Sequence, residues 1–180
     1  MSVRVYLAMS LDGLIAGPGG DISWLPHEAV EHTDALTFER HMAEVGCMLM
    51  GRATYDFVEG FEGPWPYGEV PVLVASRREL TPKVATVRRV EGDIAELLAQ
   101  ARHLADGAVV YLDGGDLVRQ AIDANLVDEL VLTIVPKALG EGVGLFTGVA
   151  RRQDYRITAA ERYGSMLQVR LKPAGLEQQA

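Results

Sequence analysis

The sequence has little cysteine, no excess of basic residues and no long apolar run. Cys47 is the only cysteine in the chain, so no intramolecular disulfide can form and the chain fits a reducing compartment. The net charge of −8 argues against a general nucleic-acid binder, which needs a basic face. No apolar stretch is long enough to cross a bilayer, and residues 1–17 lack the unbroken apolar segment of a signal peptide. These absences predict a cytoplasmic protein with no nucleic-acid or membrane partner.

The composition predicts one globular domain. The chain has 180 residues, of which 48% are hydrophobic, enough to build a single well-formed core. The segment after Lys172 is polar. We therefore expect a single domain over residues 1–172 and a polar tail over 173–180.

Short apolar segments alternate with amphipathic ones along the chain. This alternation predicts a mixed, mostly parallel sheet with helices on both faces and an antiparallel C-terminal hairpin. The expected strands are 3–9, 47–51, 71–76, 108–112 and 128–136, the expected helices are 27–45, 93–104 and 116–124, and the hairpin joins 154–163 to 165–172. The Gly/Pro-rich segment 59–69 is expected to be a surface connection, or else a lid or a dimer contact.

A glycine pair stands where one buried strand turns into a helix. Gly114 and Gly115 follow the apolar segment 108–112 directly. Without Cβ atoms, such a turn lets backbone N–H groups approach a phosphate at the positive end of the helix. The alternative is that the glycines only make a tight strand-to-helix turn. Neither G-x-G-x-x-G nor G-K-[ST] is present, so this is not a Rossmann fingerprint or a P-loop.

Polar residues of similar chemistry follow two other strands. Gly51, Arg52 and Thr54 come after the strand at 47–51, and Ser76 and Arg77 follow the strand at 71–76. Backbone amides suit a pyrophosphate, and guanidinium groups suit an additional 2′-phosphate. The strand ends therefore favour a dinucleotide with a 2′-phosphate, although three ordinary polar turns would give the same pattern.

Several motifs occur in the order found in one known fold. They are MSLDGLIA (9–16), Trp24, MGRATY (50–55), VLVASR (72–77), YLDGGDLV (111–118) and LVDELVLTIVPKALGEGVGLF (126–146). In this order the chain resembles the dihydrofolate-reductase-like fold. It is most similar to the branch that contains the reductase domain of the bifunctional riboflavin-biosynthesis deaminase/reductase, over roughly residues 3–172.

The resemblance implies an eight-stranded sheet, a homodimer and NADPH as cofactor. By position, Arg52 and Arg77 would face the 2′-phosphate. Thr54 and the turn at Gly114–Gly115 would face the pyrophosphate, and Trp24 would lie near the substrate. Asp12 and Gly13 would lead into a mobile loop over the site. The full expected cofactor set is Ala8, Ile15, Ala16, Gly51, Arg52, Thr54, Ser76, Arg77, Gly114, Gly115, Asp116 and Leu117.

The sequence departs from this family in two places. Asp113 stands where dihydrofolate reductases often have glycine and the riboflavin branch often has glutamate, and Asp116 adds a second carboxylate near the expected phosphate. Carboxylates within a Debye length of about 8 Å of the phosphate weaken anion binding unless they point away from it. Asp116 also suits a helix N-terminus. The zinc signature of the deaminase domain is absent, so this chain is not expected to perform the deamination.

Hydride transfer also requires a proton donor. On the expected helix 27–45, Asp34 and Glu31 fall beside Phe38 within the apolar stripe. A carboxyl group there would have a raised pKa if it faced a ligand cavity, or would simply meet water if the first turns project beyond the core. Asp34, Glu31 and Trp24 are the candidate catalytic residues. The four histidines and Cys47 show no metal-ligand spacing, so no metal is expected, and the histidines are placed on helix surfaces.

The sequence thus predicts an NADPH-dependent reductase acting on a small heterocyclic substrate, ribosylaminopyrimidinone-like or pterin-like, of the riboflavin-biosynthesis type. Dihydrofolate reductase activity is an alternative. A non-catalytic NADPH-binding module is another, and Asp113 keeps it open.

Overall fold

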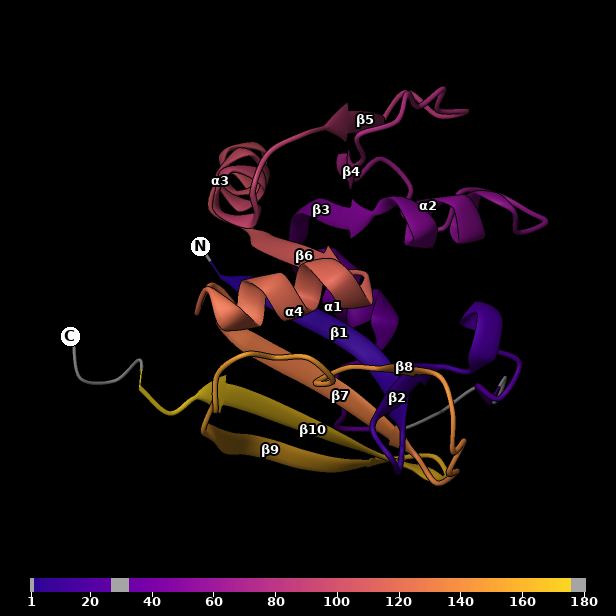
Figure 1. Ribbon diagram of the computed structural model, residues 1–180, viewed down its shortest axis with the longest axis vertical. Coiled ribbons are helices and arrows are strands. Elements are labelled where there is room, and N and C mark those ends of the chain that lie inside the picture. The colour runs from indigo at the N-terminus through magenta and orange to yellow at the C-terminus, as the bar shows by residue number, and fades with distance from the viewer. Residues whose placement is uncertain (1, 27–32, 176–180) are drawn as a thin grey trace.

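The computed structural model describes residues 2–26 and 33–175. Its main sheet has eight strands in the order β5-β4-β3-β6-β1-β7-β10-β9, as Figure 1 shows. β10 runs antiparallel to both of its neighbours, and the other neighbouring pairs are parallel. The strands are β1 (Val3–Ser10), β3 (Val45–Gly51), β4 (Val72–Ala75), β5 (Val87–Val90), β6 (Val109–Asp113), β7 (Glu129–Val135), β9 (Tyr155–Tyr163) and β10 (Met166–Pro173).

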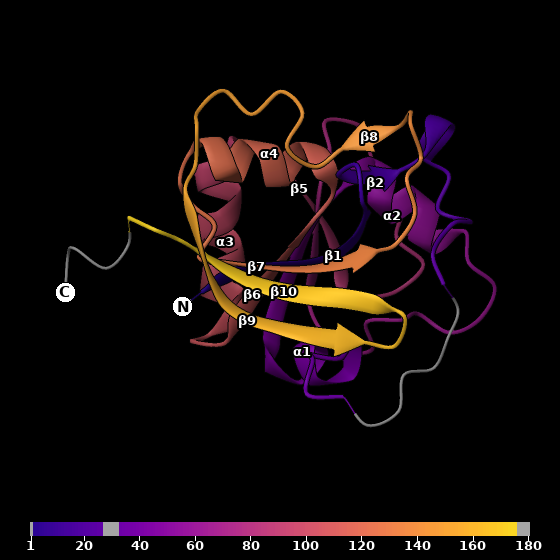
Figure 2. The same ribbon diagram turned by 90° about the horizontal axis from the view of Figure 1, so that it is seen from below.

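Helices cover both faces of this sheet. The helices are α1 (Phe38–Glu44), α2 (Arg52–Glu59), α3 (Ile94–Ala105) and α4 (Gly115–Asp123), with a short 3-10 turn η1 (Pro18–Gly20). Figure 2 shows α3 and α4 on one side of the strands and α1 on the other. A small antiparallel sheet of β2 (Leu14–Ala16) and β8 (Val143–Gly144) lies beside the main one. The predicted mixed eight-stranded, dihydrofolate-reductase-like fold is confirmed.

The central strands form because their side chains can be buried on both faces. β3, β6 and β7 are almost wholly apolar and almost wholly buried, which is the usual pattern for parallel strands between helix layers. Leu97, Leu98 and Ala101 of α3 and Val118 and Ala121 of α4 pack on one face. Tyr55 and Val58 of α2 pack on the other. Because β3 pairs in parallel with both β4 and β6, the carboxyl ends of these three strands lie at the same end of the sheet.

The helix predicted over residues 27–45 is wrong in the part that the structure describes. α1 begins only at Phe38, and the Thr37 hydroxyl accepts a hydrogen bond from the Arg40 N–H at 3.3 Å as its N-cap. The backbone of Leu36 bonds instead to side chains from the sheet. Its N–H donates to Gln168 Oε1 at 2.7 Å, and its carbonyl accepts from Gln168 Nε2 and from the Tyr6 hydroxyl. These long-range bonds replace a helical turn.

The structure also differs from the sequence analysis in three short strands, in the position of His41 and in the limit of the domain. Sequence analysis missed β5, whose sequence VRRV has two charged residues in the middle, and it missed the short β2 and β8. His41 was predicted on a helix surface but is fully buried, stacked on Tyr6 with ring centroids 4.6 Å apart. β10 ends at Pro173, one residue beyond the predicted domain limit. Of the predicted tail 173–180, residues 176–180 lie outside the described part of the chain.

Candidate active site

The turn after β6 comes very close to the turn after β3. Gly114 has φ +100°, and a Cβ on it would lie 3.0 Å from Thr54 Oγ1 and 3.2 Å from the Gly51 nitrogen. Only glycine fits this position without strain, because both the backbone angle and the space exclude a side chain. A Cβ on Gly115 would lie 2.9 Å from Ile15 Cδ1. The glycine pair therefore serves a close approach of backbone segments and not merely a turn.

Two helices begin at this approach. Gly51 is the N-cap of α2 and Gly114 is the N-cap of α4, and neither supplies a capping side chain. The first N–H groups of a helix have no partner within the helix, and the helix dipole makes this end positive. Two such ends close together form a cradle for an anion such as a pyrophosphate. Thr54 adds a hydroxyl at the same place.

The turn after β4 lies beside the first residue of α2. Arg52 Nη1 lies 3.5 Å from Ser76 Oγ and 2.9 Å from the carbonyl oxygen of Glu79. Arg52 Nε also contacts the Asp56 carboxylate at 2.6 Å. Arg77 follows Ser76 directly and is exposed. The structure thus brings Arg52 and Ser76 into contact and leaves Arg77 on the surface next to them.

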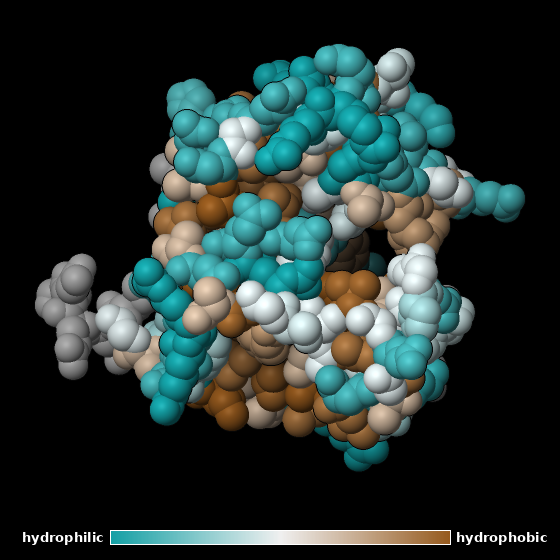
Figure 3. All heavy atoms as spheres, in the orientation of Figure 1, coloured by the Kyte–Doolittle hydropathy of each residue, from teal (hydrophilic) through white to brown (hydrophobic). Residues whose placement is uncertain are grey.

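The remaining predicted cofactor residues lie in two groups. Ile15 lies against Gly115 and Leu117 against Gly51, and Ala16 pairs with Val143 in the β2–β8 sheet. Ala8, on β1, packs instead in a cluster with Trp24. Figure 3 shows the surface hollowed between α2, the start of α4 and the β2–β8 sheet. This hollow is the place where a ligand can reach the glycine turn.

The negative charge of Asp116, beside the glycine turn, is paired with Arg119. Its carboxylate accepts a hydrogen bond from Arg119 Nη2, and Arg119 Nη1 donates to the Gly144 carbonyl at 2.8 Å. Arg119 Nη1 would lie 3.1 Å from a Cβ on Gly115. Arg119 therefore offsets Asp116 and adds a cation beside the cradle. Sequence analysis missed Arg119, although its i,i+3 spacing from Asp116 was visible.

Asp113 is a carboxyl group whose pKa is raised at this end of the sheet. Burial raises the pKa of Asp113 to about 6, although a hydrogen bond from the Gly114 N–H, 2.7 Å from Oδ1, opposes the shift. Its charge also contributes to the raised pKa values of Tyr67 and Tyr111, for which burial is the main cause. A carboxyl group with a pKa near neutrality can hold a proton and release it. Sequence analysis named Asp113 only as a departure from the family.

The predicted catalytic residues are placed differently. Asp34 is exposed in a bend before α1, so the argument that put it in an apolar helical stripe no longer applies. Glu31 lies outside the described residues. Trp24 is buried, and its indole Nε1 donates to the Asp21 carbonyl at 3.2 Å. Trp24 packs with Val135 near the carboxyl end of β7.

Asp12 ties the loop after β1 to the segment after β7. Its carboxylate accepts hydrogen bonds from the Ser10 hydroxyl at 2.6 Å and from the N–H groups of Leu139 and Gly140. The Ser10 bond, followed by those from Gly140 and Leu139, lowers the pKa of Asp12 to about 2. These bonds hold the two loops together beside the small β2–β8 sheet.

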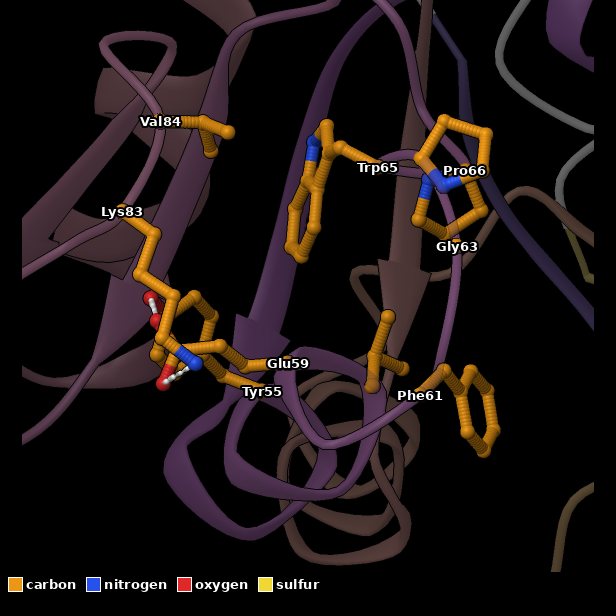
Figure 4. A pocket seen from close by; sticks show the side chains of 10 residues that line it. Tyr55, Glu59, Phe61, Gly63, Trp65, Pro66, Lys83 and Val84 are labelled. Carbon is orange, nitrogen blue, oxygen red and sulfur yellow. Dashed lines mark hydrogen bonds and ion pairs between the residues drawn. The ribbon is translucent and has the colours of Figure 1, made fainter.

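Two aromatic side chains of the segment 59–69, Trp65 and Tyr67, pack inward, whereas Phe61 is exposed. Trp65 and Tyr67 join the cluster that contains Tyr55 of α2. Figure 4 shows a pocket of about 120 Å³ between this segment and Lys83–Val84, with the Trp65 ring at its wall. Val58 and Glu59 line this pocket from the C-terminal end of α2, together with Tyr55, and its lining includes none of the residues of the glycine turn.

Comparison with known proteins decides the family. The model of the family described as the RibD C-terminal domain matches residues 1–169. The chain belongs to the RibD C-terminal domain family. This assignment confirms the resemblance to the reductase domain of the riboflavin-biosynthesis deaminase/reductase.

Relatives of this RibD C-terminal domain protein cover nearly all of the chain. YwjB of Bacillus subtilis (strain 168), an uncharacterized protein, is 24% identical over 165 residues, which span 92% of this chain and 94% of YwjB. A crystal structure from Shewanella sp. PV-4, provisionally assigned to riboflavin biosynthesis, is 30% identical with a TM-score of 0.81 and covers 96% of this chain and 99% of that one.

The fold is also that of one part of a bifunctional enzyme. The deaminase/reductase of Thermotoga maritima has a TM-score of 0.65 at 20% identity, and the match covers 96% of this chain but 56% of that one. The RibD C-terminal domain here thus corresponds in fold to just over half of the longer protein. In the described part of the chain, no helix is both long enough and apolar enough to span a membrane.

Proposed function

We propose that the protein is an NADPH-dependent reductase that transfers a hydride to a small heterocyclic substrate, ribosylaminopyrimidinone-like or pterin-like. The observation that carries the proposal is the convergence of the N-termini of α2 and α4 at Gly51 and Gly114. Membership of the RibD C-terminal domain family supports a reductase in the riboflavin pathway.

The residues present fit NADPH. The absence of a Cβ on Gly114 lets the N-termini of α2 and α4 approach each other, so that their backbone N–H groups and Thr54 would bind the pyrophosphate, and Arg52 and Ser76 would hold the 2′-phosphate. Ile15, Ala16 and Leu117 would line the cofactor, with Ala8 of β1 and Trp24, which pack in one cluster, further along the site. When bound, NADPH supplies the hydride.

Asp113 would supply the proton for this reaction. Its carboxyl group has a pKa of about 6 because it is buried, so roughly half of the molecules carry this proton at pH 6 and roughly one tenth at pH 7. A protonatable carboxyl group beside the cofactor cradle favours turnover over a binding module without catalysis. It also gives Asp113 the proton-donor role that sequence analysis assigned to Asp34 or Glu31.

Cofactor affinity tests the proposal directly. We expect wild-type protein to bind NADPH more tightly than NADH, and Arg52→Ala to lose at least about tenfold in NADPH affinity, since hydrogen bonds to charged groups contribute about 1.5–3 kcal/mol. NADH affinity should change by less than about twofold. Arg151→Ala, which removes an exposed arginine elsewhere, is the matched control. Absence of NADPH binding by folded wild-type protein would overturn the proposal.

The substrate class needs a separate measurement. NADPH oxidation is followed with a panel of ribosylaminopyrimidinones and pterins, including dihydrofolate. Consumption with a ribosylaminopyrimidinone supports the riboflavin-type reaction, and consumption with dihydrofolate alone supports the alternative activity. Tight binding of NADPH without consumption across the panel would favour the non-catalytic module. The homodimer and the cytoplasmic location stay predictions.

A further inference from the structure

A second arginine reaches the turn that follows β4. Arg89, on the edge strand β5, donates from Nη1 to the Ser76 carbonyl at 3.2 Å. Arg52 approaches the same serine from the start of α2, with Nη1 3.5 Å from Oγ. The two guanidinium groups therefore contact one residue from two sides. In Figure 1, β4 and β5 lie together above α2.

Both guanidinium groups are held by backbone carbonyls and are largely sheltered. Their side chains are 26% and 29% exposed for Arg52 and Arg89. Arg52 donates to the carbonyl of Glu79 and Arg89 to that of Ser76. A guanidinium group fixed in this way loses little conformational freedom when it binds an anion.

The carboxylate of Glu79 completes the cluster from the β4–β5 connection. Glu79 Oε1 lies 3.2 Å from Arg89 Nη2, and the side chain is 90% exposed. An ion pair with so exposed a partner contributes little stability. The Glu79 carboxylate can therefore leave Arg89 at little cost when a stronger anion arrives.

We propose that Arg89 and Arg52 together form the clamp for the 2′-phosphate of NADPH, and that Glu79 occupies this clamp in the free protein as an internal competitor. The inference rests on the proposed function. A phosphate offers several oxygens to two planar guanidinium groups, whereas Glu79 offers one carboxylate on a flexible chain. The competition therefore sets how strongly NADPH is preferred over NADH.

The net charge around the clamp depends on whether the Glu79 carboxylate occupies it. Arg52 and Arg89 face carboxylates of Asp56, Glu79 and Glu91. The exposed Arg77 and Arg78 lie on the same connection as Glu79. With all three carboxylates in place the clamp is nearly neutral, and a phosphate gains little from it. Displacing Glu79 leaves Arg52 and Arg89 balanced by Asp56 and Glu91, and the exposed Arg77 and Arg78 then provide the excess of positive charge.

The test measures ligand binding by calorimetry with NADPH, NADH, adenosine 2′,5′-bisphosphate and 5′-AMP. We expect Arg89→Ala to weaken binding of the two 2′-phosphorylated ligands at least about tenfold, as for other charge-assisted contacts, and to leave the others within about twofold. We expect Glu79→Gln to tighten binding of the same two ligands about threefold, as expected for loss of an exposed ion pair. Arg89→Lys keeps the charge without the planar fork and should lie between wild type and Arg89→Ala.

Matched variants separate the clamp from general charge effects. Arg88→Ala removes the same charge from the neighbouring exposed residue of β5, and Glu62→Gln removes an exposed carboxylate on another loop. If Arg89→Ala behaves like Arg88→Ala while Arg52→Ala still weakens NADPH binding, Arg89 does not bind the 2′-phosphate, but the proposed function stands. If Glu79→Gln behaves like Glu62→Gln or weakens binding, Glu79 does not compete with the phosphate for the clamp. If wild type binds no NADPH, the proposed function itself fails.

Discussion

Asp113 lies where the chemistry of the candidate site meets the interior of the protein. Its backbone ends β6 and its neighbour Gly114 closes on α2. Its carboxyl group raises the already high pKa values of Tyr67 and Tyr111. Ionisation of Asp113 is therefore opposed by burial, and the group is ready to carry a proton at the pH of a cell.

The raised pKa of Asp113 predicts a pH-dependent effect on stability. An acid whose pKa is higher in the folded than in the unfolded state favours folding when protonated, and this advantage is lost as pH rises through the folded pKa of about 6. Asp113→Asn removes that loss. We expect the variant to be more stable than wild type at pH 8 by about 1–3 kcal/mol and no more stable at pH 4, as measured by urea unfolding.

A kinetic readout complements this measurement. Asparagine keeps an oxygen that can accept the Gly114 N–H, so the turn should be preserved while the proton is lost. Turnover at pH 6 should fall by at least about a hundredfold, as for removal of a general acid, with NADPH affinity nearly unchanged. Equal stability differences at pH 4 and pH 8, together with unchanged turnover, would contradict the role given to Asp113.

At this scale the structure places the turns at Gly51 and Gly114 together, but it leaves the predicted proton donor Asp34 exposed in a bend. Gly51, Arg52 and Gly114 stand out because glycine and arginine at strand ends have few other uses. Burial is what raises the pKa of Asp113, and burial at the end of β6 depends on segments that are distant in the sequence. No local pattern indicates that packing, so the raised pKa could not be predicted from neighbours in the sequence.

At the scale of elements, the cradle depends on how closely the β6–α4 turn approaches the β3–α2 turn. Gly114→Ala would add a Cβ only 3.2 Å from the Gly51 nitrogen, at a φ of +100°. We expect a loss of about 2–4 kcal/mol in unfolding free energy, from strain of about 1–2 kcal/mol plus the steric overlap. NADPH affinity should fall at least tenfold, as measured by calorimetry.

Gly107→Ala separates strain from overlap. Gly107 has a similar φ of +92°, but no atom lies within 4 Å of its added Cβ. This variant should lose only the strain term and keep wild-type NADPH affinity. If both variants lose the same stability and affinity, the close approach of the two turns does not control the site.

The elements themselves were predicted unevenly, for physical reasons. Buried strands such as β3 and β6 have continuous apolar sequences, and α3 has a clear helical period. The helix predicted over 27–45 was wrong because Gln168, from β10, bonds to the backbone of Leu36. β5 was missed because Arg88 and Arg89 interrupt its pattern, although Arg89 is a residue that the proposed clamp requires.

At the scale of the whole molecule, an ion network crosses the sheet beneath α1. Glu129 of β7 accepts from Arg4 Nε of β1 at 2.6 Å and from Arg170 Nη2 of β10 at 2.8 Å. Arg4 also contacts Glu44 of α1. Desolvation alone would raise the pKa of Glu129, but the hydrogen bonds and charges of Arg170 and Arg4 lower it overall.

The same network holds His41 in its neutral form. Burial and, to a smaller extent, the nearby charge of Arg4 lower the pKa of His41 to about 4, while Glu129 opposes the shift. The ring lies between Tyr6 and Tyr111, so it connects α1 to the strand that ends at Asp113. The layer behind the candidate site is thus built from charges whose balance depends on Glu129.

Removing Glu129 should weaken the whole fold in a pH-dependent manner. Glu129→Gln leaves Arg4 buried with a weaker partner, for which we expect a loss of about 3 kcal/mol at pH 7. Because the folded pKa of Glu129 is lowered, its contribution is present above the unfolded value near 4.3 and is lost as pH falls below it. The difference between variant and wild type, measured by urea unfolding, should therefore narrow below about pH 4. Glu62→Gln, on an exposed loop, should show no such dependence, and a constant difference from pH 7 to pH 3.5 would mean that packing, not charge, supports this layer.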